Sequence, residues 1–133
     1  GVAEIQTALL NLLELALLRH CDEDAAFFAK RYASLTQLFC LPEWMQYNAH
    51  LQLAVIQKNK AACLAILQKM LPAMKNASPP EACPLYRNTD CAVSAFLSAK
   101  LADTLCDDIA VQEEYAFLRD CAQLQELLAQ ARN

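Results

Sequence analysis

The chain has 133 residues, of which 56% are hydrophobic and 20% charged, and its formal net charge is −4. This composition predicts one folded domain with a sizeable core, and the acidic balance offers no basic surface for nucleic acid or an anionic membrane. Gly1 is the only glycine, which excludes the dinucleotide fingerprint, the Walker phosphate loop, the EF-hand loop and the G-x-S-x-G elbow, because all four need backbone without a Cβ. The most apolar run, residues 5–18, is shorter than the ~20 apolar residues that cross a bilayer.

The first part of the chain predicts two helical hairpins. An acidic cluster at 22–24 favours a helix start, since carboxylates complement the helix dipole there. Pro42 suits the first position of a third helix, and Asn59 tolerates the left-handed backbone of the next turn. The helices predicted here cover residues 2–20, 22–40, 43–58 and 60–75.

The second part predicts a third pair of helices after an irregular connection. Residues 76–90 hold three of the five prolines. A helix is expected over 91–106, and Asp107 with Asp108 would then start a last helix over 109–132. We therefore expect a single all-α domain over 1–133, with about six helices stacked as three αα-hairpins. A closed helical bundle is the alternative architecture.

The helix expected over 43–58 has apolar residues on two opposite sides. Trp44, Leu51 and Val55 share one side, and Met45, Ala49 and Leu53 share the other. A helix buried on two sides lies between layers, which favours a stacked array. Two polar strips separate the apolar sides; one consists of Gln46, His50 and Gln57, and the other of Asn48 and Gln52.

Residues 44–72 resemble one hairpin of the tetratricopeptide family. Trp44 and Pro72 fall in the outer frame of its motif of about 34 residues, while Asn48 and Lys60 stand where the family has Gly and Ala. The bulky apolar positions are kept by Tyr47, Leu51, Leu64 and Leu67. The resemblance implies an αα-repeat fold that holds a peptide or protein partner in a groove, with no catalytic residues to carry over.

The cysteines and histidines are not arranged in a pattern typical of a catalytic or metal-binding site. The seven cysteines are an odd number without a C-x-x-C pair, which predicts reduced structural thiols and a cytoplasmic protein. The densest group of metal-ligand types is the segment 20–24. Neighbouring helical residues point ~100° apart, so His20 is badly placed to activate Cys21, and we interpret this segment as a helix end followed by a cap. We expect no enzyme activity, no metal and no cofactor.

These observations favour a non-enzymatic interaction module that binds a peptide, a protein or a second copy of itself. The homodimer is favoured because so apolar a chain has more hydrophobic surface than six helices easily hide. The alternative function is a regulatory or sensor domain of a larger intracellular protein, for example a transcriptional one. Neither nucleic acid nor a membrane is expected to bind directly. The candidate partner-binding residues are Gln46, His50, Gln57, Tyr86 and Arg87.

Overall fold

The computed structural model describes residues 1–77 and 91–132, with side chains from residue 97 onward in the second range. The described residues form six α-helices and two 3₁₀ helices, which confirms the all-α fold. The elements are α1 Val2–Leu18, α2 Asp22–Leu38, the 3₁₀ helix η1 Glu43–Tyr47, α3 Asn48–Ile56, α4 Lys60–Lys75, α5 Cys91–Val111, the 3₁₀ helix η3 Glu113–Leu118, and α6 Ala122–Arg132.

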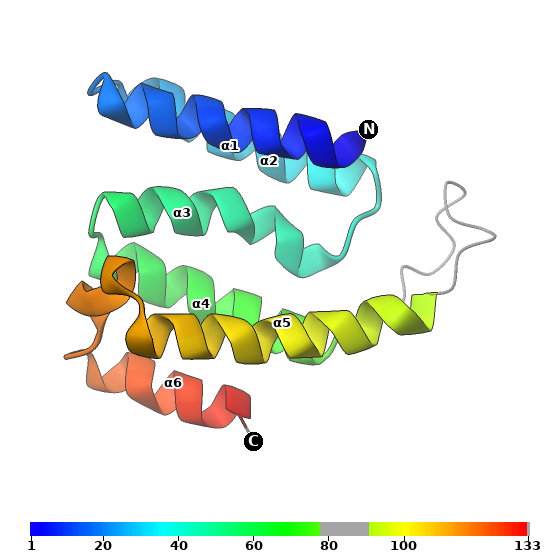
Figure 1. Ribbon diagram of the computed structural model, residues 1–133, viewed down its shortest axis with the longest axis vertical. Coiled ribbons are helices and arrows are strands. Elements are labelled where there is room, and N and C mark those ends of the chain that lie inside the picture. Colours follow the sequence, from blue (N-terminus) through cyan, green and yellow to red (C-terminus); the bar gives the residue numbers. More distant parts are fainter. Residues whose placement is uncertain (78–90, 133) are drawn as a thin grey trace.

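The helices lie in layers along the long axis of the molecule. Figure 1 shows α1 and α2 together at one end, α3 next to them, then α4 and α5, and α6 at the other end. The main contacts join helices that follow one another in the chain, from α1 with α2 through to α4 with α5. Each helix therefore buries its apolar side mostly against its sequence neighbours.

The α3 helix separates two hydrophobic clusters, as the two-sided pattern predicts. Ala49 belongs to the smaller cluster, with α1 and α2, whereas Leu51 and Val55 belong to the larger one, with the rest of the molecule. Met45 differs from its predicted side, because it packs against the larger cluster together with Trp44. Both residues lie in η1, and the tighter winding of a 3₁₀ helix rotates side chains out of the α-helical phase.

A buried hydrogen bond ties η1 to α5. The indole Nε1 of Trp44 donates to Ser98 Oγ at 2.8 Å, and the two residues are only 7% and 2% exposed. Ser98 lies on the side of α5 that carries small residues, which include the fully buried Ala102 and Cys106. Small side chains let neighbouring helices approach closely enough for this bond to form.

Three helices end in the same hydrogen-bonded motif. His20, Cys40 and Lys58 have φ values of 59°, 51° and 53°, and each follows the C-cap of α1, α2 or α3. In all three turns the N–H of the positive-φ residue and the next N–H bond back to helix carbonyls, as in a Schellman motif. That position usually holds glycine, and this chain fills it with residues that carry a Cβ.

The turn between α3 and α4 corrects the predicted role of Asn59. Lys58 takes the left-handed conformation, while Asn59 is the N-cap of α4 and its side chain accepts a hydrogen bond from the N–H of Ala62 at 3.1 Å. Pro42 is likewise the N-cap of η1 and not its first residue.

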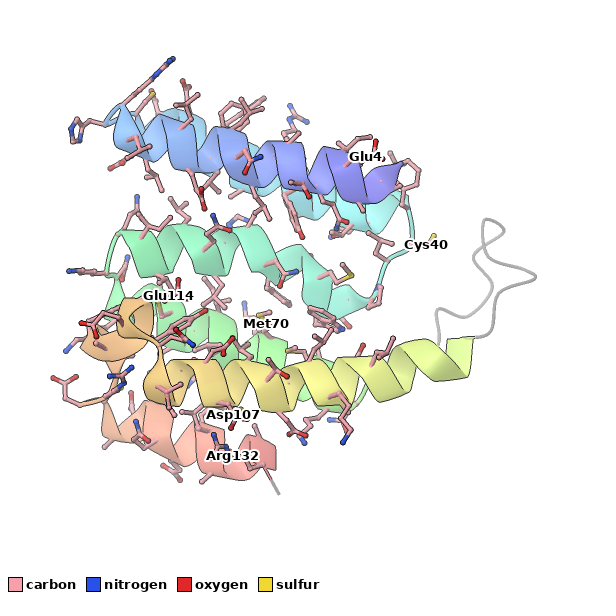
Figure 2. All side chains as sticks on the ribbon, viewed as in Figure 1. Glu4, Cys40, Met70, Asp107, Glu114 and Arg132 are labelled. Carbon is pink, nitrogen blue, oxygen red and sulfur yellow. The ribbon has the colours of Figure 1, made fainter. Side chains whose placement is uncertain are left out.

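The predicted boundary between the last two helices is wrong. Asp107 and Asp108 lie inside α5, and the segment expected as one helix over 109–132 divides into the end of α5, η3 and α6. The helix continues because Cys106 and Ile109 are fully buried at helical spacing. Asp107 instead accepts a hydrogen bond from Arg132 Nη2 of α6 at 2.9 Å, and Figure 2 shows both residues where α5 faces α6.

Candidate functional site

A groove crosses α3 and gathers side chains from three layers of the fold. It has a volume of about 490 Å³. Figure 2 shows two of its residues, Met70 and Glu114, in the region between α3 and α5. The residues that line the groove are Leu10, Glu14, Asn48, Leu51, Gln52, Val55, Ile56, Met70, Leu105, Glu114 and Tyr115.

The floor of the groove is apolar and its rim is acidic. Leu51, Val55 and Met70 are each less than a tenth exposed, so they form the floor. Glu14 of α1 and Glu114 of η3 are exposed carboxylates, and the described lining residues include no lysine, arginine or histidine. Apolar contact with negative charge at the rim suits a ligand that combines an apolar side chain with cations.

Polar side chains fix the distance between α1 and α3 beside the groove. Gln52 Nε2 donates a hydrogen bond to Glu14 Oε1 at 2.6 Å. Asn48 Nδ2 and Gln6 Nε2 each lie 3.4 Å from the hydroxyl oxygen of Tyr32, which is 3% exposed. These contacts orient the strip of Asn48 and Gln52 toward the α1 and α2 hairpin.

Burial raises the pKa of the Tyr115 phenol. Loss of solvent, with smaller contributions from the negative charges of Glu114 and Asp108, raises the pKa of Tyr115 to about 12. At neutral pH the half-buried hydroxyl is protonated, as in any tyrosine, and can donate a hydrogen bond.

The three predicted partner-binding residues that the structure describes, Gln46, His50 and Gln57, do not line this groove. Gln46 is half-buried in η1, and its Oε1 accepts a hydrogen bond from Gln37 Nε2 of α2 at 3.1 Å. His50 is half-buried on α3, and burial lowers the pKa of its imidazole below the ordinary value of 6.5. Gln57 is the exposed C-cap of α3. Tyr86 and Arg87 lie outside the described residues.

The cysteines differ from the predicted set of reduced thiols. Cys40 is disulfide-bonded, which corrects that expectation and removes the argument for the cytoplasm that rests on it. Four others are free: Cys21, Cys63, Cys106 and Cys121. Burial raises the pKa of Cys63 to about 11 and also raises the pKa of Cys106 above its ordinary value. The thiolate form of these two side chains is therefore disfavoured at neutral pH.

The segment 20–24 does not form a metal site in the described structure. His20 is the positive-φ residue after α1, Cys21 is the N-cap of α2, and the three acidic residues occupy the first turn of α2. Among the described residues, no group of three His, Cys, Asp or Glu side chains is placed to hold a metal ion.

Sequence reasoning identified both polar strips of α3 but selected the other one. Asn48 and Gln52 line the groove, and the signal for them was their i, i+4 spacing between two apolar faces. Glu114 and Tyr115 gave no such signal, because their segment was expected to be part of a continuous helix.

Comparison with known proteins gives no similarity from which a function could be inferred. No family model, curated protein or solved structure matches this chain. Within the described residues, no helix is both long enough and apolar enough to cross a membrane.

Proposed function

We propose that the protein is a non-enzymatic interaction module whose groove binds a peptide segment with apolar and basic side chains. The observation that carries this proposal is the composition of the groove, which combines an apolar floor with Glu14 and Glu114 at the rim and no cation among the lining residues that the structure describes. An apolar side chain of the peptide that packs on Leu51 and Val55 would be removed from water. Each further 100 Å² of apolar surface buried in this way contributes ~2.5 kcal/mol before association costs. A lysine or arginine next to that side chain in the peptide would form ion pairs with the carboxylates of Glu14 and Glu114.

The stacked helices support this use of the groove. Its walls come from α1, α3, α4, α5 and η3, so a segment bound there would contact several layers at once. The resemblance of residues 44–72 to a tetratricopeptide hairpin agrees with it, since that family holds peptides on stacked helices. We likewise propose that residues 44–72 form a repeat of this kind.

The state of the thiols and of the histidine fits a role without covalent chemistry. Nucleophilic cysteines need a lowered pKa or an adjacent base, whereas burial raises the pKa of Cys63 and of Cys106. The lowered pKa of His50 is accounted for by burial alone.

A designed peptide tests the proposal directly. The probe is a fluorescein-labelled amphipathic peptide of leucine and lysine, and its fluorescence anisotropy is compared with that of the same pattern written with glutamate. We expect the lysine peptide to bind more tightly and Glu114→Lys to weaken it about threefold to fivefold, as for a partly screened ion pair.

Glu113→Lys is the matched control. Glu113 is also exposed and acidic in η3, but it does not line the groove, so the net charge changes equally in both variants. Equal weakening by the two substitutions, or equal binding of the two peptides, would contradict the proposed groove.

A further inference from the structure

The α1 helix carries a row of apolar side chains that its contacts with α2 do not cover. Ile5 is 48% exposed, Leu12 and Leu15 are each 42% exposed, and Ala8 is also exposed. The buried Leu13 of the same helix lies on a different side and belongs to the smaller hydrophobic cluster. Four apolar positions on one helix thus face away from the core.

The spacing of this row is that of a coiled-coil seam. Ile5, Ala8, Leu12 and Leu15 follow one another at intervals of three, four and three, which are the a and d positions of a heptad. We propose that a second copy of this chain covers the seam, with the two α1 helices antiparallel about a two-fold axis. This interface goes beyond the peptide groove, because none of the four seam residues lines that groove.

One alignment of the two helices places an apolar residue opposite another apolar residue in every layer of the pair. With the axis level with Leu10, Ile5 of each copy lies opposite Leu15 of the other, and Ala8 lies opposite Leu12. A large side chain meets a small one in the two central layers, and a and d positions face each other as antiparallel coiled coils require. The surface is therefore self-complementary, which is the property a two-fold interface needs.

Charge at the ends of α1 favours the antiparallel orientation. Glu4 lies near the start of the seam, where its carboxylate pairs with the N-terminal ammonium of Gly1 at 3.1 Å, and Arg19 follows the end of the seam; both side chains are exposed. In an antiparallel pair, Glu4 of one copy approaches Arg19 of the other at both ends. A parallel pair would instead bring the two arginines together at one end, with no carboxylate of the seam opposite them.

The helix needs no folding step before it pairs. Leu13 is fully buried and Ala16 nearly so against the α2 hairpin, so α1 is already ordered. Binding by a preformed helix avoids the ordering cost that weakens short isolated coiled coils. The seam would therefore pair two helices that are already folded.

Sedimentation velocity of the full chain at increasing micromolar concentration tests the dimer. We expect a concentration-dependent shift from monomer to dimer, and Leu12→Glu should raise the dimer Kd by about a hundredfold, because each dimer loses two apolar contacts and gains two buried charges. Leu101→Glu is the matched control, since Leu101 is 46% exposed on α5, in another layer. Should Leu12→Glu fail to fold by circular dichroism, Ala8→Glu makes the same test.

A charge exchange tests the orientation. Glu4→Arg and Arg19→Glu should each weaken the dimer about threefold, and the double variant should recover the original Kd. A monomer at every concentration, or equal effects of Leu12→Glu and Leu101→Glu, would overturn the seam. Single exchanges without effect, or a double variant weaker than either single one, would overturn the antiparallel pairing.

Discussion

Replacing Ser98 with alanine probes the bond that joins η1 to α5. The substitution leaves the indole N–H of Trp44 without its partner at 2.8 Å, in a place where Trp44 is only 7% exposed. An unpaired buried donor costs about 1–3 kcal/mol, and alanine returns roughly 0.5 kcal/mol through its higher helix propensity. We therefore expect Ser98→Ala to lower the free energy of unfolding by about 1–2 kcal/mol.

Urea denaturation measures this change, with the fluorescence of the single tryptophan as the probe. Ser34→Ala is the matched control, because Ser34 is exposed on α2 and bonds only to the carbonyl of Lys30 in its own helix, at 3.1 Å. The control should keep or slightly raise stability. In a Trp44→Phe background, followed by circular dichroism, Ser98→Ala should cost much less. Equal effects of the two serine substitutions, or an unchanged cost in that background, would refute the reasoning.

Two further predictions concern backbone strain and pH. Lys58→Gly should raise the free energy of unfolding by about 1 kcal/mol in thermal denaturation, because φ is 53° at that position. Lys69→Gly, at an exposed position within α4, should lower the free energy of unfolding by a similar amount. A loss of stability in both variants would contradict the strain at Lys58. The pKa of Tyr115 is raised from about 10 to about 12 in the folded protein, so the stability it contributes is complete below pH 10 and is lost as the pH rises from 10 to 12. Tyr115→Phe should therefore flatten the fall in stability over that range, and an unchanged slope would count against the raised pKa.

Local signals predicted the helices well wherever their ends are set by nearby residues. The bounds of α4, Lys60–Lys75, agree with the prediction because Asn59 caps one end of the helix and its apolar spacing ends at the other. The two aspartates at 107 and 108 misled the prediction, since adjacent carboxylates favour a helix start. Asp107 instead pairs with Arg132, which is distant in sequence.

The candidate site depends on contacts that no local pattern encodes. The two polar strips of α3 are equivalent by periodicity, and only the positions of α1 and η3 decide that Asn48 and Gln52 line the groove. Gln46 is bonded to Gln37 of α2, a contact that spacing within one helix cannot reveal. The disulfide at Cys40 is similarly a matter of tertiary proximity.

The smaller hydrophobic cluster packs the amino-terminal hairpin against α3. Its buried residues are Leu13, Ala16, Ala25, Ala29, Tyr32 and Ala49. Alanine contributes one methyl group, or roughly 0.8 kcal/mol on burial, so this cluster gains less from packing than the larger one with its tryptophan, methionines and leucines. We therefore expect the hairpin to open before the rest of the molecule in sub-global fluctuations. A molecule that binds only the closed hairpin would lower the population of this open form.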